Sequence, residues 1–203
     1  MGRLVYNPET HEYSVDGKRP PSVTEILEAV GVSDHRFVPP EALKRGSDIH
    51  LACHYYVTGV LDMDTLHPDY VPYLTRFAEF IETTGFQVEA SEVPAYHEDY
   101  KFCGCPDLVG RMNGHTWLID IKSNSSPKWS PIQLAAYQQL LEGTGCMGWP
   151  IQKRGVLLLK PDRPAKLIPC REVSDHNEWQ VCLSMYRTLE KYGRLNGGRE
   201  NGS

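Results

Sequence analysis

The sequence predicts a single α/β domain with a mixed central β-sheet flanked by helices. Three observations favour this fold class. Apolar residues recur at three- and four-residue spacing between residues 22 and 83, as in helices that pack on a core. Residues 87–122 read as strands joined by turns. Past residue 130 a helical segment leads into a short apolar strand, and a chain of 203 residues is long enough to bury one core.

The first third of the chain is predicted to be a hairpin followed by helices. Asp16-Gly17 is a tight-turn dipeptide after the second strand. Ser22 or Thr24 can cap the first helix, which stops at Gly31 because glycine suits the left-handed conformation that ends helices. Pro39-Pro40 opens the next helix. We expect strands at 4–6 and 12–15 and helices at 25–30, 39–59 and 68–83.

The middle of the chain is predicted to be rich in strands. Asn113-Gly114 is a strong hairpin signal, because both residues accept the positive φ angles of a two-residue turn. Ser174 or Asp175 can cap the last helix, and the tail at 196–203 is expected to be disordered. We expect an antiparallel meander at 87–96, 101–112 and 116–122, helices at 130–141 and 174–192, and strands at 155–160 and 166–169.

The composition excludes several classes of protein. With 40% hydrophobic and 23% charged residues, the chain reads as globular. No apolar run approaches the roughly 20 residues of a membrane helix, and the six cysteines, without a secretory signal, are expected to be reduced. We therefore expect a soluble, intracellular protein.

Charge is distributed unevenly along the chain, whose net charge is −5. Residues 1–100 hold 7 basic and 17 acidic side chains, whereas residues 101–171 hold 10 basic and 4 acidic ones. A basic middle segment can steer a phosphate backbone. Uneven surface charge without any function accounts for the same counts equally well.

Three charged residues in the predicted meander suggest chemistry. Side chains alternate along a strand, so Asp120 and Lys122 project to one side while Ile121 turns into the core. Pairing across the Asn113-Gly114 turn brings Asp107 near Asp120. Two adjacent carboxylates suit Mg²⁺ or Mn²⁺, and a lysine beside such an ion can orient a water molecule. An ordinary Asp–Lys ion pair explains a lone D-x-K more often.

Further residues with suitable chemistry surround this motif. Gly104 lets the backbone pass close to the site, and Glu92, on the preceding predicted strand, adds a carboxylate. Gln133 and Tyr137 lie one helical turn apart on one helix face. His50 offers a helix-borne imidazole as another ligand. His50 and His54 do not form a zinc-protease motif, because position 51 is Leu instead of Glu; we read His54 as a helix-face histidine.

In this order and at these spacings the residues resemble the PD-(D/E)xK nuclease superfamily, in particular its RecB-like branch. The chain is similar to phage exonucleases and to the mitochondrial genome-maintenance exonuclease, which shares the segment Pro21-Ser22-Val23-Thr24. The resemblance implies a restriction-endonuclease-like core and metal-dependent cleavage of DNA. If a phage encodes the protein, as it encodes some of these exonucleases, we expect it in the cytoplasm of a bacterial host. The motifs that carry it are Arg45-Gly46…His50, Glu92, Gly104…Asp107, Asp120-Ile121-Lys122 and Gln133…Tyr137.

The resemblance also implies roles for these residues. Lys122 would position the attacking water, and Gln133 and Tyr137 would orient Lys122 or the DNA backbone. Residues 1–195 would form one nuclease domain, with an N-terminal hairpin and short helix at 1–38, a helical wall at 39–83 and a catalytic core at 84–192. The Mg²⁺ or Mn²⁺ ligands would be His50, Asp107, Asp120 and the Ile121 carbonyl, with Glu92 direct or through water.

The expected partner is DNA, single-stranded or with free ends. Trp129 and Trp149 could stack bases, although both tryptophans fit core or rim packing equally well. The cysteines lack the one-upstream, three-clustered pattern that holds an iron–sulfur cluster in some RecB-like nucleases, so none is expected. The candidate DNA-binding residues are Arg45, Lys128, Trp129, Lys153 and Arg154.

The sequence thus predicts a DNA exonuclease acting in recombination, repair or replication. An endonuclease or flap nuclease on the same site is the first alternative. A non-catalytic nucleic-acid-binding subunit is the second, but clustered carboxylates facing phosphates do not help a binding module.

Overall fold

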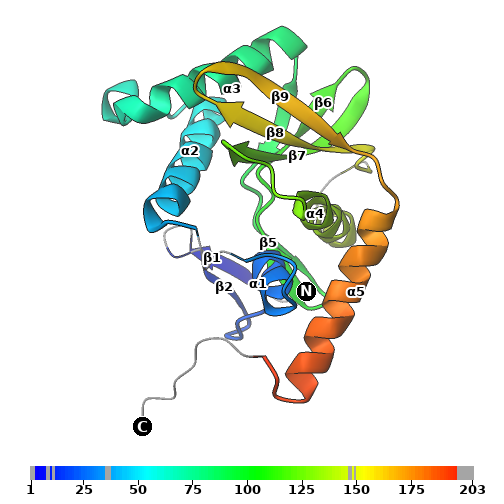
Figure 1. Ribbon diagram of the computed structural model, residues 1–203. Coiled ribbons are helices and arrows are strands. Elements are labelled where there is room, and N and C mark those ends of the chain that lie inside the picture. The colour runs from blue at the N-terminus through cyan, green and yellow to red at the C-terminus, as the bar shows by residue number, and fades with distance from the viewer. Residues whose placement is uncertain are drawn as a thin grey trace.

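A five-stranded mixed β-sheet forms the centre of the protein in a computed structural model, which describes residues 3–7, 10, 12–34, 38–145, 148 and 150–195 (Figure 1). Only β7 and β8 pair in parallel; the other neighbours are antiparallel. The strand order is β3-β6-β7-β8-β9. The strands are β3 Gln87–Ser91, β6 Leu108–Met112, β7 His115–Ser123, β8 Lys153–Lys160 and β9 Arg163–Cys170.

Helices cover both faces of this sheet. On one face lie α2 Pro40–Thr58 and α3 Val71–Thr84, joined by the short 3-10 turns Met63–Thr65 and Pro68–Tyr70. On the other lie α1 Val23–Ala29, α4 Ser130–Thr144 and α5 Ser174–Lys191. Two hairpins complete the fold, β1 Leu4–Asn7 with β2 Glu12–Val15 and β4 Ala95–His97 with β5 Phe102–Gly104.

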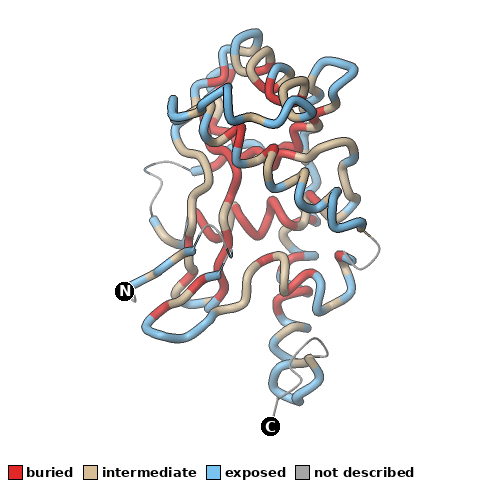
Figure 2. The backbone as a smooth tube through the Cα atoms, turned by 90° about the vertical axis from the view of Figure 1, so that its left-hand side faces the viewer, coloured by how far each residue is buried: buried red, intermediate tan, exposed pale blue. Residues whose placement is uncertain are grey.

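Two hydrophobic cores follow from the alternation of side chains along the strands. On β7, Leu118 packs toward α4 and α5, whereas Ile119 and Ile121 pack toward α2 and α3. Buried residues therefore gather along the sheet and on the helix sides that face it (Figure 2). Asp120 and Lys122 share the side of Leu118, as the alternation predicts.

Most of the predicted helices and strands are confirmed, and so are several of the capping and turn residues that predicted them. Ser22, and not Thr24, caps α1 in a reciprocal capping box with Glu25. The cap predicted for the last helix is wrong, because α5 begins after Val173 with no side-chain cap. The carboxylate of Asp175 instead pairs with Arg154, 3.1 Å away.

Two predicted strands are each broken in two. The stretch 87–96 divides into β3 and β4 at Glu92, whose φ is 51°, and 101–112 divides into β5 and β6 around Pro106. A proline has no N–H for a sheet ladder, which favours a break there. The breaks lie opposite each other, because Glu92 N donates to Asp107 O at 2.9 Å and Val93 N to Pro106 O at 3.1 Å. The hairpin β4–β5 thereby leaves the sheet.

Some expectations fall on residues that the structure does not describe. Trp149 and the tail 196–203 lie outside the described residues. Among the residues it does describe, no helix is long and apolar enough to cross a membrane.

Candidate active site

The paired strand breaks bring the predicted site residues together at one end of the sheet. In the β6–β7 hairpin Leu108 faces Ile119, so Asp107 stands beside Asp120. The turn has the two positive φ angles that its sequence predicts, 51° at Asn113 and 73° at Gly114. Oδ2 of Asp107 accepts a hydrogen bond of 2.7 Å from the Ile121 N–H. This bond fixes the carboxylate at the junction of the two strands.

Three side chains form a compact group with metal-ligating atoms. One atom each from His50 on α2, Glu92 after β3 and Asp107 before β6 lie within 4.8 Å of one another. His50 Nδ1 is 3.4 Å from Asp107 Oδ2. We call these three residues the acidic cluster. His54, one turn after His50, lies outside it and contacts the hydroxyl of Ser91 at 3.1 Å.

Asp120 lies next to this cluster, and its two carboxylate oxygens have different surroundings. Oδ1 accepts a hydrogen bond of 2.9 Å from Lys122 Nζ. Oδ2 is buried and has no hydrogen-bond partner in the described part of the chain. A buried carboxylate oxygen without a partner is costly, and a cation bound there would satisfy it. The donor set, carboxylates with one imidazole, fits a divalent ion.

The charges of the site also favour a bound divalent ion. Burial first, and then the negative charge of Asp107, raise the pKa of Glu92 to about 7. Burial also raises the pKa of Asp120 to about 6; Lys122 opposes this shift and Asp107 adds to it. Carboxyl groups that are driven to hold protons near neutral pH lack sufficient positive charge nearby.

The pKa values of His50 and Asp107 shift in opposite directions. Burial would raise the pKa of Asp107, but the charge and hydrogen bond of His50, followed by Lys122, outweigh it and hold that pKa below its usual value. Burial would lower the pKa of His50, but Asp107 outweighs it and raises that pKa. The two residues therefore favour an ion pair with each other.

A chain of hydrogen bonds holds the lysine. Nζ of Lys122 donates to Gln133 Oε1 at 3.2 Å, and Gln133 Nε2 donates to the Tyr137 hydroxyl at 3.1 Å. A Cβ at Gly104 would come within 2.7 Å of the Tyr137 ring, so only glycine allows this close packing. Burial lowers the pKa of Lys122, but Asp120 and then Asp107 more than reverse this and raise it. Lys122 is therefore an oriented ammonium group.

Cys105 is a member of the site that the sequence analysis missed. Its Sγ donates to Glu92 Oε2 at 3.3 Å, and burial raises the pKa of the thiol far above its usual range, so it remains a neutral donor. The available signal was its position two residues before Asp107. The break at Pro106 makes it useful, because it turns this segment out of the strand ladder and toward Glu92.

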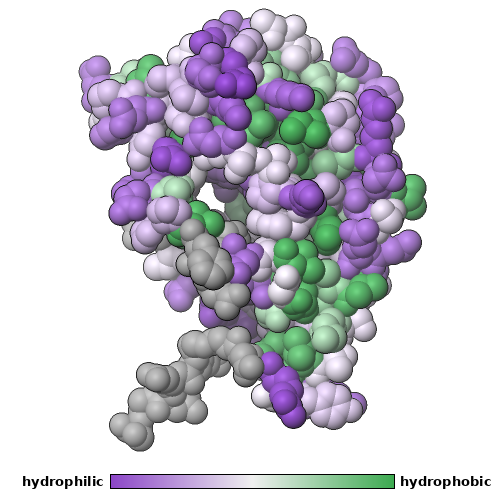
Figure 3. Space-filling model, in the orientation of Figure 1, coloured by the Kyte–Doolittle hydropathy of each residue, from purple (hydrophilic) through white to green (hydrophobic). Residues whose placement is uncertain are grey.

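The candidate DNA-binding residues lie in different surroundings. Lys128 is exposed in the segment between β7 and α4, and the Trp129 ring lies 5.7 Å from Lys122 Nζ. Arg45 lies on α2, where Nε is buried without a hydrogen-bond partner among the described residues. Figure 3 shows the molecule hollowed beside α2 and the end of β7.

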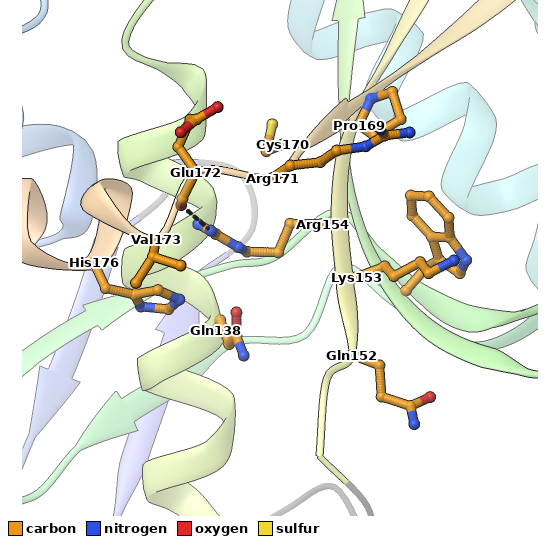
Figure 4. A pocket seen from close by; sticks show the side chains of 11 residues that line it. Gln138, Gln152, Lys153, Arg154, Pro169, Cys170, Arg171, Glu172, Val173 and His176 are labelled. Atoms are coloured by element: carbon orange, nitrogen blue, oxygen red, sulfur yellow. Dashed lines mark hydrogen bonds between the residues drawn. The ribbon is translucent and has the colours of Figure 1, made fainter.

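Lys153 and Arg154 lie at the other end of the sheet. On β8, Lys153 precedes Leu158, the strand partner of Lys122, by five residues. Five residues span about 17 Å of strand. The two side chains extend to opposite sides of β8 beside a cavity of about 590 Å³ (Figure 4). Lys153 Nζ lies over the Trp117 ring at 5.4 Å.

Arg154 has the surroundings of a structural residue. It is 6% exposed, pairs with Asp175, and donates to the carbonyls of Pro131 and Glu172 at 3.2 Å each. These bonds join β8 to α4 and α5. The guanidinium is thus committed to the protein interior, and its position does not suit the phosphate contact that the sequence analysis expected.

Comparisons with known proteins bear on the fold. No protein-family model and no curated protein sequence matches the chain. A candidate exonuclease of Eubacterium rectale is similar in structure, with a TM-score of 0.51 and 14% identity over 92% of this chain and 80% of that one. The alkaline exonuclease of Laribacter hongkongensis superposes less well, with a TM-score of 0.42 and 15% identity over 86% and 89% of the two chains.

At these identities the first likeness establishes the fold alone, and the second is too loose to add to it. The predicted fold class, a mixed central sheet flanked by helices, is confirmed.

Proposed function

We propose that the protein is a metal-dependent deoxyribonuclease of the RecB-like PD-(D/E)xK type, related to the phage and mitochondrial exonucleases, that hydrolyses DNA as an exonuclease. The observation that carries this proposal is the unsatisfied acidic cluster: three ligating side chains within 4.8 Å, beside a buried Asp120 oxygen without a partner among the described residues. An ordinary Asp–Lys ion pair does not account for the three ligating side chains beside it. The exonuclease description of the Eubacterium rectale protein agrees with the proposal.

Mg²⁺ or Mn²⁺ is the proposed ion, since carboxylate oxygens dominate the donor set. His50, Glu92, Asp107 and Asp120 would hold it, together with the Ile121 carbonyl. When bound, the ion would neutralise charge that develops on the phosphate oxygens.

The remaining residues of the site would orient the reactants. Lys122, fixed by Asp120 and Gln133, would hold the attacking water and stabilise negative charge on the phosphate. Gln133 and Tyr137 restrict the lysine to one position. A preorganised ammonium needs no rearrangement during the reaction, which is why such chains of hydrogen bonds support catalysis.

Single-stranded DNA or a free DNA end is the proposed substrate, in recombination, repair or replication. Exposed Lys128 and half-buried Trp129 lie next to the catalytic lysine, where they could contact a phosphate and a base. Arg45 offers a second cation from α2. Lys153 could act only further along the strand.

The proposal is tested with labelled linear and circular DNA, single- and double-stranded, with Mg²⁺, Mn²⁺ or a chelator. We expect linear single strands to be degraded only with metal, while closed circles resist. Circles cut as fast as linear strands would leave an endonuclease in place of the exonuclease. Binding of DNA without cleavage under every metal condition would leave the non-catalytic alternative.

A further inference from the structure

Ser91 lies at the junction where the two broken strands meet. It is the last residue of β3, directly before Glu92, and its strand partner Leu108 directly follows Asp107. The Ser91 hydroxyl donates to the backbone carbonyl of Asp107 at 3.1 Å, and the same carbonyl accepts the Glu92 N–H at 2.9 Å. The backbone of one proposed metal ligand is thus bonded to two consecutive residues, and one of these is itself a proposed ligand.

The hydrogen bond between His54 and Ser91 has a defined direction. His54 Nδ1 lies 3.1 Å from the Ser91 hydroxyl oxygen. A hydroxyl has one proton, and that of Ser91 points to the carbonyl of Asp107, which can only accept. His54 Nδ1 therefore carries a proton and donates a hydrogen bond to Ser91. Burial lowers the pKa of His54, which favours a neutral ring with its single proton on Nδ1.

These contacts give the H-x-x-x-H pattern of α2 a role other than zinc binding. His50 and His54 lie one helical turn apart on the same face of α2. His50 Nδ1 is 3.4 Å from the Asp107 carboxylate, and His54 is connected to the Asp107 carbonyl through Ser91. Two successive turns of α2 are therefore connected to Asp107, the first through its side chain and the second through its backbone.

The second connection is compatible with a bound metal ion, whereas the first competes with it. His50 and Asp107 are both proposed ligands, so an ion that both of them bind competes with their contact to each other. The atoms that join His54, Ser91 and the Asp107 backbone are not among the proposed ligating atoms. This connection can therefore hold α2 at the strand break whether or not the site contains an ion.

We propose that His54 and Ser91 are positioning residues: they hold α2 against the strand break and so assemble the acidic cluster before a metal ion binds. The inference rests on the proposed metal-dependent function and adds to it two residues that organise the metal site. Groups that orient metal ligands typically contribute about 10- to 100-fold to metal affinity. Ser91 should contribute more than His54, because its hydroxyl takes part in both hydrogen bonds.

The first test is the Mn²⁺ affinity of the folded full chain, measured by calorimetry without DNA. Ser91→Ala removes both hydrogen bonds and should weaken Mn²⁺ binding by about 10- to 100-fold. Ser91→Thr keeps a hydroxyl and should restore most of the affinity. His54→Leu keeps the Ser91–Asp107 bond and should weaken binding by a smaller factor. Thr58→Ala is the matched control, because the Thr58 hydroxyl bonds only to carbonyls of α2, and should leave the affinity unchanged.

NMR of the histidine ring nitrogens separates positioning of the site from support of the fold. In wild type the ¹⁵N shifts of His54 should show the proton on Nδ1, with and without Mg²⁺, and Ser91→Ala should release the ring to the other tautomer. A proton on Nε2 alone in wild type would overturn the inference. Wild-type Mn²⁺ affinity in both folded Ser91→Ala and folded His54→Leu would also overturn it, because these residues would then only stabilise the fold.

The outcomes also distinguish this inference from the proposed function. Wild type that binds Mn²⁺ but never cleaves DNA, with weakened Mn²⁺ binding in Ser91→Ala, would contradict the nuclease proposal and retain the positioning role. Metal-dependent cleavage by wild type, with unchanged Mn²⁺ affinity in both variants, would contradict only the positioning role. A wild type without affinity for Mg²⁺ or Mn²⁺ would overturn both.

Discussion

Two ion pairs, one half-buried and one buried, lie at opposite ends of the central strand pair and differ in how many of their polar atoms have hydrogen-bond partners. Asp120–Lys122 on β7 and Arg154–Asp175 between β8 and α5 have similar lengths, 2.9 and 3.1 Å. Arg154 also donates to two backbone carbonyls. Asp120 keeps one oxygen without a partner in the described part of the chain and stands beside further acids. A pair whose polar atoms all have partners stabilises structure, whereas a buried carboxylate oxygen without a partner is suited to bind a ligand.

The largest expected effect follows from removing a negative charge at Asp107 or Asp120. Asp107→Asn and Asp120→Asn should each abolish cleavage and weaken metal binding by more than about 100-fold, since even groups that only orient metal ligands contribute 10- to 100-fold. Calorimetry should show metal affinity and activity lost together. Asp162→Asn, at an exposed position, is the control. Cleavage at the wild-type rate in either variant would exclude that residue from the site.

Removing the lysine should separate catalysis from binding. Lys122→Ala should bind metal and DNA but cleave about 100- to 10,000-fold more slowly, because the ammonium acts on the water and the transition state. Single-turnover rates at saturating DNA measure the effect. If the variant instead unfolds, Lys122 is a structural ion-pair partner like Arg154.

Disrupting the Arg154–Asp175 pair should lower stability and leave metal binding unchanged. Arg154→Ala strands Asp175 in the interior, which should cost about 3–5 kcal/mol of unfolding free energy. Urea denaturation measures this loss. Metal affinity of the folded fraction should not change. A stable Arg154→Ala variant with weakened DNA binding would restore the phosphate-binding role expected from the sequence.

Metal-free protein should lose stability as pH rises. Glu92 and Asp120 have pKa values near 7 and 6 in the folded state, above their usual values. Such groups stabilise the fold below their unfolded pKa of about 4 and lose that contribution as pH rises to about 7. Thermal unfolding between pH 5 and 8 should show the loss, and Mn²⁺ should suppress it. Metal affinity should rise roughly tenfold per pH unit for each proton released.

The smallest expected effect is at Lys128. Lys128→Glu should leave stability unchanged, because the side chain is exposed, and should weaken binding to all DNA sequences alike. The slope of log affinity against log salt should fall by about 1 if Lys128 contacts one phosphate. An unchanged slope would remove Lys128 from the DNA path.

The parts of the site that sequence could predict are those with local signals. Asn113-Gly114 determines the register of the hairpin that joins Asp107 to Asp120, and strand alternation separates Lys122 from Ile121. The 3.6-residue helical period places Gln133 and Tyr137 on one face. Each of these inferences spans a few residues, within which backbone geometry alone decides the outcome.

The parts that sequence could not predict depend on tertiary contacts. Glu92 and Pro106 break their strands at matching positions, and the match is visible only once the strands are paired. Arg154 looked like an exposed cation, because the carboxylate that neutralises it lies 21 residues later on another element.

The crossover from β7 through α4 has a consequence for the order in which the protein folds. The Lys122–Gln133 bond closes a segment of 11 residues, whereas the His54–Ser91 bond that ties α2 to the strand of Glu92 spans 37. Closing the longer loop costs about 1 kcal/mol more in chain entropy. The Lys122–Gln133 contact can therefore form locally and early. The acidic cluster is completed only when α2 docks.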